Sequence, residues 1–239
     1  SKYIPVFSKK YRKKNEKFIT SQDPNDTYAQ GLNGNVIALW QSHGWYFEPK
    51  LNRWEWQRAR IFQTVEDLYT QGYVMPFLMP MLENAGAYVL SPRERDFNVN
   101  EVVVDGDGYL AQSRYEEISG KETWKSANIA GFAYKKAVLK NGDNPFKDGG
   151  VRMVKTVAQG EKSSVAKWLP QLPEAGNYAV YVSYASMPNS ATDAPYRIHS
   201  RSGIKEFKVN QQMGGGTWIY LGTFGFDAGK SNAYKVVLS

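Results

Sequence analysis

Histidine, the side chain best suited to bind a metal or move a proton near neutral pH, occurs only twice in the 239 residues, at His43 and His199. His43 follows an apolar run at residues 36–40, and Glu66 lies 23 residues later in a predicted helix. A histidine after a strand and a carboxylate on the next helix are typical of half a metal site, because a catalytic zinc ion takes about three protein ligands. The pair predicts a zinc site only if a further ligand completes it.

A structural role is the alternative for each of these residues. A histidine after a strand is often held by hydrogen bonds, and a glutamate on a helix is often a solvated charge. His199 precedes Ser200-Arg201-Ser202-Gly203, which predicts a strand-end or turn residue.

Aromatic side chains are the second group with ligand-binding chemistry. They make up 14% of the chain, with 16 Tyr and 7 Trp, and aromatic rings stack on sugar rings as readily as they pack in β-rich cores. We expect ligand contacts from Trp124, Tyr196, Arg197 and Trp218. Core packing is the alternative for Trp218, which stands beside a predicted strand.

Other binding signals are weak or absent. Asp105 and Asp107 resemble the start of a calcium loop but lack its later glutamate, so calcium is not predicted. Gly214-Gly215-Gly216 lacks the Lys-Ser/Thr of a phosphate-binding loop. The chain contains no cysteine, which excludes disulfides, thiolate metal sites and a cysteine nucleophile.

The net charge of +7 belongs to one end of the chain. Residues 1–17 contain seven Lys or Arg and one Glu, which leaves +1 for everything that follows. We interpret residues 1–34 as a basic extended arm or linker and do not expect nucleic-acid binding. No apolar run approaches the ~20 residues that span a bilayer. The chain begins at Ser1 without methionine, so we expect a removed leader or a trimmed chain.

Two parts with different periodicities follow the arm. The run at 36–40 predicts a strand covered on both faces, residues 44–57 an aromatic loop, and the pattern from Arg58 a helix that breaks near residues 72–75 and restarts at 75–84. Gly86 predicts the helix end, and residues 87–90 a second strand parallel to the first. From residue 101, short strands separated by turn residues predict an all-β sandwich or jelly roll. The predicted parts are therefore 35–100, an α/β segment, and 101–239.

The α/β segment resembles the start of a zinc-dependent N-acetylmuramoyl-L-alanine amidase. That family has an apolar strand ending in Gly-His-Gly, a helix that opens with a zinc-binding Glu, a Gly, an apolar strand, and an Arg followed by an Asp. The matching positions are Ser42-His43-Gly44, Glu66, Gly86, 88–90, Arg93 and Asp96. The resemblance implies that His43 and Glu66 are the first two zinc ligands. Trp40-Gln41-Ser42 replaces the usual Asp-Pro-Gly, and no second ligand histidine or late catalytic glutamate follows in that segment.

Residues 101–239 resemble a golvesin C-terminal-like domain, which is similar to carbohydrate-binding jelly rolls and accompanies secreted bacterial enzymes, some labelled xanthan lyases. Several spaced motifs in the right order carry this resemblance. They lie at 104–107, 168–178, 194–196, 209–218, 221–224, Phe226 and Gly229.

Together the two resemblances predict an accessory carbohydrate- or cell-wall-binding β-sandwich joined to an incomplete zinc amidase-like hydrolase segment. We expect a bacterial protein that is secreted, periplasmic or at the cell surface, and whose partner is polysaccharide or peptidoglycan. The β module is expected to be inserted into the amidase-like domain, whose remainder would lie beyond Ser239. One alternative is an active zinc-dependent peptidoglycan amidase or polysaccharide-degrading enzyme when the full-length chain is present. Another is an inactive amidase-like scaffold.

Overall fold

The computed structural model describes residues 17–22, 31–41, 43–58, 60–62, 64–107, 113–135 and 138–239. Most of the predicted basic arm and Ser42 lie outside these residues. In the described part of the chain, no helix is long and apolar enough to cross a membrane.

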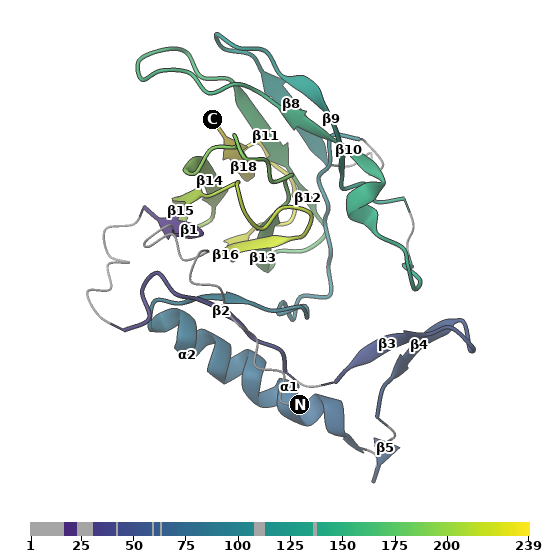
Figure 1. Ribbon diagram of the computed structural model, residues 1–239. Helices are drawn as coiled ribbons and strands as arrows, with labels where there is room; N and C mark the ends of the chain where they lie inside the picture. The colour runs from purple at the N-terminus through teal and green to yellow at the C-terminus, as the bar shows by residue number, and fades with distance from the viewer. Residues whose placement is uncertain are drawn as a thin grey trace, which may run out of the picture.

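A parallel strand pair with a helical crossover forms the first part of the structure (Figure 1). Strand β2 pairs in parallel with β7, as predicted, and the helical elements connect them. The elements are β2 (Val36–Ala38), α1 (Glu66–Tyr73), the π-helical turn η3 (Val74–Leu78), α2 (Met79–Asn84) and β7 (Tyr88–Leu90). Gly86 ends the helix at φ 99°, in the left-handed region that favours glycine.

The helix differs from its prediction in two ways. It begins at Glu66 rather than Arg58, because the intervening residues form a tight antiparallel pair, β5 (Arg60–Ile61) and β6 (Thr64–Val65). It also does not break at its prolines. The chain passes through the wider turn of η3, which contains Pro76, and continues into α2. A π-helical turn relieves the clash and missing donor that a proline brings to a regular α-helix.

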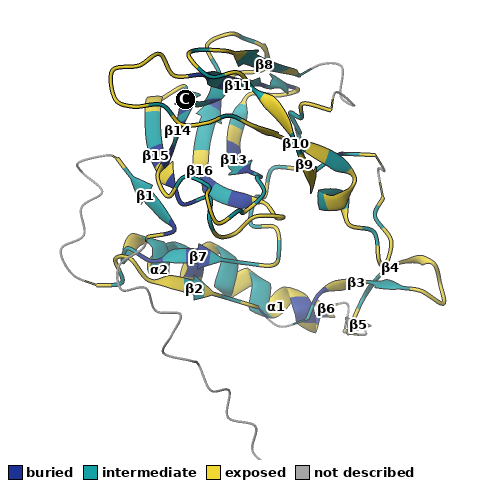
Figure 2. Cartoon of the chain, turned by 45° about the horizontal axis from the view of Figure 1, so that its top comes forward, coloured by how far each residue is buried: buried dark blue, intermediate teal, exposed yellow. Residues whose placement is uncertain are grey.

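The two faces of the parallel pair are covered by different partners. Val89 packs with Met79 of α2 in a small core, whereas its neighbours Tyr88 and Leu90 pack against the core of the β-rich part. This division follows from strand geometry, because successive side chains point to opposite faces. The prediction that the first strand is covered on both faces is wrong for Val36, which is 48% exposed. Figure 2 shows that much of β2 is exposed.

The regular structure of the remaining chain is almost entirely β-strand, which agrees with the predicted sandwich. A six-stranded sheet has the order β1-β15-β14-β18-β11-β8, and the pair β13–β16 faces it across the main hydrophobic core. These strands are β1 (Ile19–Ser21), β8 (Arg114–Ile118), β11 (Val165–Leu169), β13 (Gly176–Val182), β14 (Ala194–Ser200), β15 (Gly203–Val209), β16 (Ile219–Phe226) and β18 (Lys235–Leu238). Two further pairs are β9 (Lys125–Gly131) with β10 (Gly149–Met153), and β12 (Gln171–Leu172) with β17 (Gly229–Lys230). Strand β1 comes from the predicted arm and extends the sheet by pairing with β15.

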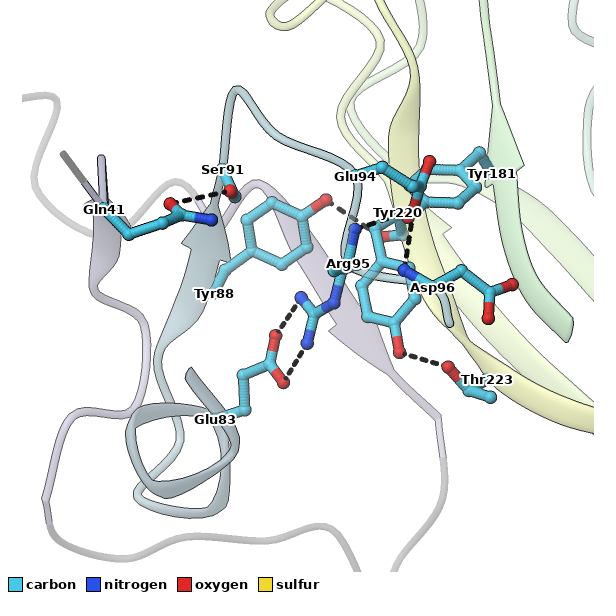
Figure 3. A network of polar contacts seen from close by, with 10 residues as sticks. All are labelled: Gln41, Glu83, Tyr88, Ser91, Glu94, Arg95, Asp96, Tyr181, Tyr220 and Thr223. Atoms are coloured by element: carbon cyan, nitrogen blue, oxygen red, sulfur yellow. Dashed lines mark hydrogen bonds and ion pairs between the residues drawn. The ribbon is translucent and has the colours of Figure 1, made fainter. Parts of the chain in front are cut away.

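A polar network joins the two parts of the structure (Figure 3). Arg95, which follows β7, donates to both carboxylate oxygens of Glu83 in α2, at 2.6 and 2.7 Å. Its guanidinium carbon lies 4.0 Å from the ring centroid of Tyr220 in β16. The hydroxyl of Tyr88 donates to the Tyr220 carbonyl at 2.8 Å. Helix, parallel pair and β-rich part therefore meet at one arginine.

The residues beside Arg95 fasten the same segment to β13. Glu94 accepts a hydrogen bond from the Tyr181 hydroxyl at 2.7 Å, and Asp96 accepts one from the Ala179 amide at 2.8 Å. Burial, followed by the bond to Glu94, raises the pKa of Tyr181, so this phenol stays protonated and remains a donor at neutral pH.

We expect Arg95→Lys to lower the free energy of unfolding by about 2 kcal/mol, because an ammonium cannot replace both the bidentate bonds and the contact with Tyr220. Urea unfolding measures this difference. Arg53→Lys is the matched control, since the Arg53–Glu55 pair is at the surface and such pairs contribute about 0–1 kcal/mol. Equal effects of the two substitutions would contradict this role of Arg95.

A second ion pair connects the β9–β10 hairpin to the large sheet. Arg152 donates to both oxygens of Glu117 in β8, each at 2.7 Å, and to the Ser126 hydroxyl at 2.8 Å. The hydroxyl of Tyr115 also donates to Glu117, at 2.7 Å. The bonds from Arg152 are the main reason why the pKa of Glu117 lies below its usual value.

Because the folded-state pKa of Glu117 is lowered, its contribution to stability is present above the unfolded-state pKa and is lost as pH falls through the folded-state value. We expect Glu117→Gln to cost about 1 kcal/mol at pH 7, since Arg152 is partly exposed, and to cost nothing at about pH 2. Urea unfolding at both pH values measures this, with exposed Glu101→Gln as the control. A cost that does not change with pH would rule out the charge as its source.

Candidate functional site

His43 lies just beyond β2 and is covered by Arg58. Nε of Arg58 is 3.2 Å from Nδ1 of His43, and Nη2 is 3.2 Å from Nε2. The two ring nitrogens point away from each other, so one planar guanidinium cannot reach both within the plane of the imidazole. The guanidinium therefore lies across the ring face.

The carboxylate nearest His43 is that of Asp67, not that of Glu66 as predicted. Asp67 is fully buried, its Oδ1 is 3.6 Å from Nδ1 of His43, and its Oδ2 accepts a hydrogen bond from the Arg58 amide at 3.2 Å. The Glu66 side chain is 62% exposed, and its closest recorded partner is Nε of Arg58 at 4.0 Å. Both acids stand in the first turn of α1, and only the structure separates the buried one from the solvated one.

The described residues do not fit a catalytic zinc site. No group of three or more His, Asp or Glu side chains in this part of the chain could hold a metal ion. Such a site takes about three protein ligands, and a cation bound to either imidazole nitrogen would also meet the guanidinium of Arg58. We therefore derive no catalytic step from His43 and Glu66.

The neighbouring residues at the end of the parallel pair are tightly packed. A Cβ at Gly44 would lie 1.8 Å from Nη1 of Arg93, so only glycine lets that guanidinium lie against the backbone. Gln41 is 1% exposed, and its Oε1 is 3.5 Å from the Ser91 hydroxyl. The close approach of Arg93 to the backbone explains why residue 44 is glycine, without any role in metal binding.

A groove with a volume of about 1310 Å³ lies in the β-rich part. Its walls include the extended segment 98–107, the β9–β10 hairpin and strand β13. Aromatic side chains are prominent in its lining and include Trp124, Phe132, Phe146, Tyr181, Tyr184 and Trp218.

The structure places three of the four predicted ligand-binding residues, Trp124, Tyr196 and Trp218, in the lining of this groove. Trp218 is 39% exposed, and its ring centroid is 4.6 Å from that of Phe132 and 5.7 Å from that of Phe146. The two phenylalanines thus fix the orientation of an accessible indole. Nε1 of Trp124 is buried and has no hydrogen-bond partner among the described residues.

Tyr196 touches the groove only from within the core, and Arg197 is not among the lining residues. Tyr196 is 2% exposed, belongs to the main core and accepts a hydrogen bond from Gln211 at 2.9 Å. Burial raises the pKa of its phenol. Arg197 is the next residue of β14 and points to the opposite face, where it donates to the Ser239 hydroxyl. Strand alternation thus separates Tyr196 from Arg197, and ligand contact by either residue stays a prediction.

The remaining candidate residues have structural surroundings. His199 pairs with Ile204 and Lys235 within the sheet, and burial is the main cause of its lowered pKa. Asp107 accepts a hydrogen bond from the Gly150 amide at 2.8 Å. Burial, with the nearby Asp107, raises the pKa of Asp105.

The fold and groove define a mostly β, sandwich-like module that is packed against a short α/β segment. Residues 147–239 match the family model of the golvesin C-terminal domain. The match includes Tyr196, Arg197 and Trp218, and it begins after Trp124.

Two xanthan lyases are similar to part of the chain. The enzyme of Bacillus sp. (strain GL1) is 30% identical over 77 residues, which cover 32% of this chain and 8% of the relative. The solved structure of Paenibacillus xanthan lyase is 23% identical with a TM-score of 0.38, over 53% of this chain and 11% of that one. The chain thus spans a small fraction of either relative. The family match and the Bacillus relative support the golvesin-like and xanthan lyase-like parts of the resemblance, and the amidase-like part stays a prediction.

We expect the purified chain to retain well below one zinc ion per molecule, because Arg58 covers the imidazole and the described residues lack a third ligand. Elemental analysis after incubation with zinc and desalting measures this content, with His43→Ala as the control. One equivalent that disappears in His43→Ala would contradict the expectation and support the enzyme alternative.

Proposed function

We propose that the β-rich part is an accessory module that binds polysaccharide, or the glycan of the cell wall, in the groove beside Trp218. The observation that carries this proposal is the position of Trp218 in the groove, where Phe132 and Phe146 hold its partly exposed indole. An indole offers a flat apolar face to the C–H groups of a sugar ring. Because the ring is already fixed, little side-chain entropy is lost on binding.

The size and lining of the groove suit a segment of a sugar chain. Its volume of about 1310 Å³ exceeds the roughly 300–1,000 Å³ typical of small-molecule sites. Polar groups such as Arg152 and Asn189 are among the lining residues, together with the aromatic rings. Sugar recognition needs both, since hydroxyl groups require hydrogen-bond partners when they leave water.

The comparisons support the same class of ligand. The golvesin match covers Trp218, and the similar proteins are named for an activity on xanthan, a polysaccharide. The chain spans 8% of the curated relative, so the proposal does not extend to lyase activity. A module of this kind would act where such polymers occur, on the bacterial surface, in the periplasm or outside the cell.

Two other functions are secondary proposals. A zinc-dependent amidase, acting on peptidoglycan when the full-length protein is present, draws on His43 and Glu66 near the end of a parallel strand pair. It needs ligands that the described residues do not supply. An inactive amidase-like scaffold needs none, and in that reading Arg58 fills the space beside His43.

We expect Trp218→Ala to weaken binding to a recognised polysaccharide roughly 10- to 30-fold, the usual cost of losing a central tryptophan. Affinity electrophoresis in gels that contain soluble polysaccharides, xanthan included, and sedimentation with insoluble peptidoglycan measure the affinity. Trp218→Phe keeps an aromatic face and is expected to lose less.

Tyr69→Ala is the matched control, because Tyr69 is a 71% exposed aromatic residue on α1, away from the groove. Binding of no polymer by the wild type, or equal binding by the wild type and Trp218→Ala, would overturn the proposal.

A further inference from the structure

A second aromatic surface lies outside the groove, on the hairpin formed by β3 (Trp45–Glu48) and β4 (Arg53–Trp56). The register pairs Trp45 with Trp56 and Phe47 with Trp54. Since side chains alternate along a strand, these four rings share one face of the hairpin. The opposite face carries the polar set Tyr46, Glu48, Arg53 and Glu55.

The pairing continues to His43 and Arg58. The Gln57 amide donates to the Gly44 carbonyl at 3.0 Å, which keeps the register beyond the two strands and sets His43 opposite Arg58. The contacts of 3.2 Å between their side chains agree with this position. The aromatic face therefore ends in the half-exposed guanidinium of Arg58. Among the paired positions 43–48 and 53–58, no residue on the aromatic face is a glutamate or aspartate.

The rings are held rigidly but not covered. Trp45 and Trp56 are 5.2 Å apart at an interplanar angle of 82°, and Phe47 and Trp54 are 5.9 Å apart at 78°. Edge-to-face pairs of this kind fix ring orientation. Trp45 is nevertheless 52% exposed and Trp54 39% exposed. An isolated two-stranded hairpin with open aromatic rings is marginally stable in water, so this surface gains from a ligand.

The hairpin is also fastened toward the groove. Nε1 of Trp54 donates to the Leu139 carbonyl at 3.0 Å, and Leu139 lines the groove in the β-rich part. Figure 1 shows the hairpin projecting from the end of the helix toward the loop that follows β9. A chain molecule that leaves the groove at Leu139 would meet the aromatic face next.

We propose that this face, with Arg58 at its base, is a second binding site for an acidic polysaccharide. Sugar rings lie on Trp45 and Trp54, and a carboxylate substituent pairs with the guanidinium of Arg58. Charge complementarity favours this occupant, because Arg58 presents a half-exposed cation on the aromatic face and the glutamates of the hairpin lie on its other side. The present counter-charge of Arg58 is Glu66, whose carboxylate is 62% exposed and 4.0 Å from Nε, and a ligand carboxylate would replace it. A purely apolar partner would bury this loosely paired guanidinium without offering a new counter-charge.

The experiment compares affinities for xanthan, whose side chains carry carboxylates, and for the same polymer after chemical reduction of its carboxyl groups. We expect Trp45→Ala to weaken binding of both polymers roughly 10-fold. Arg58→Gln is expected to weaken binding of the acidic polymer roughly 5-fold or more and that of the reduced polymer less than 2-fold. Tyr46→Ala, on the opposite face of the same strand and 40% exposed, is the matched control and is expected to change neither.

The outcomes separate this site from the groove. Loss of binding in Trp218→Ala with wild-type binding in Trp45→Ala and Arg58→Gln overturns the hairpin site and leaves the groove proposal standing. Loss of binding in Trp45→Ala with wild-type binding in Trp218→Ala overturns the groove proposal and leaves the hairpin site standing. Dimerisation of the wild type that Trp45→Ala abolishes, seen by sedimentation velocity, assigns the face to a second copy of the chain and overturns the proposal. Trp45→Phe, which keeps an aromatic ring in the hairpin, separates a folding defect from a lost contact.

Discussion

The ion pair between Arg95 and Glu83, stacked on Tyr220, is the constraint on which the arrangement of the molecule depends. Two parallel strands and one helix bury too little surface to be stable alone. The pair β2–β7 is stable here because α2 covers one face and the β-rich core covers the other. Arg95 bonds to Glu83 of α2 and stacks on Tyr220 of β16, so it holds both the helix and the β-rich part against the strand pair. The segment that follows forms a wall of the groove, and the groove thus depends on the same contact.

The strands of the sandwich core could be predicted from the sequence because buried strands contain runs of apolar residues. β13, β14 and β16 are examples, and all three lie in the part from residue 101 where short strands were predicted. β8 and β9 could not be predicted, since they are mostly polar and are held by ion pairs such as Glu117–Arg152. The start of the helix was missed for a related reason. The pairing of β5 with β6 is a local contact that helical periodicity does not reveal.

The candidate sites show the same limit. Trp124 and Trp218 were identified by residue type, and the structure places both in one groove. Tyr196 also lines it but is 2% exposed, whereas Arg197 faces the opposite way because neighbours in a strand alternate. Alternation was also the missed signal in residues 44–57, where aromatic residues recur at every second position and indicate one shared face rather than an irregular loop. The contact of Asp67 and Arg58 with His43 requires the register of the hairpin, which no sequence pattern specifies.

The most direct test of the account is to observe the tryptophans while a sugar chain binds. In a nitrogen-labelled sample, the 7 indole N–H groups give separate resonances that substitutions assign. On addition of xanthan oligosaccharides, the account predicts saturable shifts at Trp218, Trp45 and Trp54 and none at Trp40, which is 74% exposed but lies outside both the groove lining and the paired strands of the hairpin. Spectra that do not change, or that change at Trp40 and not at Trp218, would contradict it.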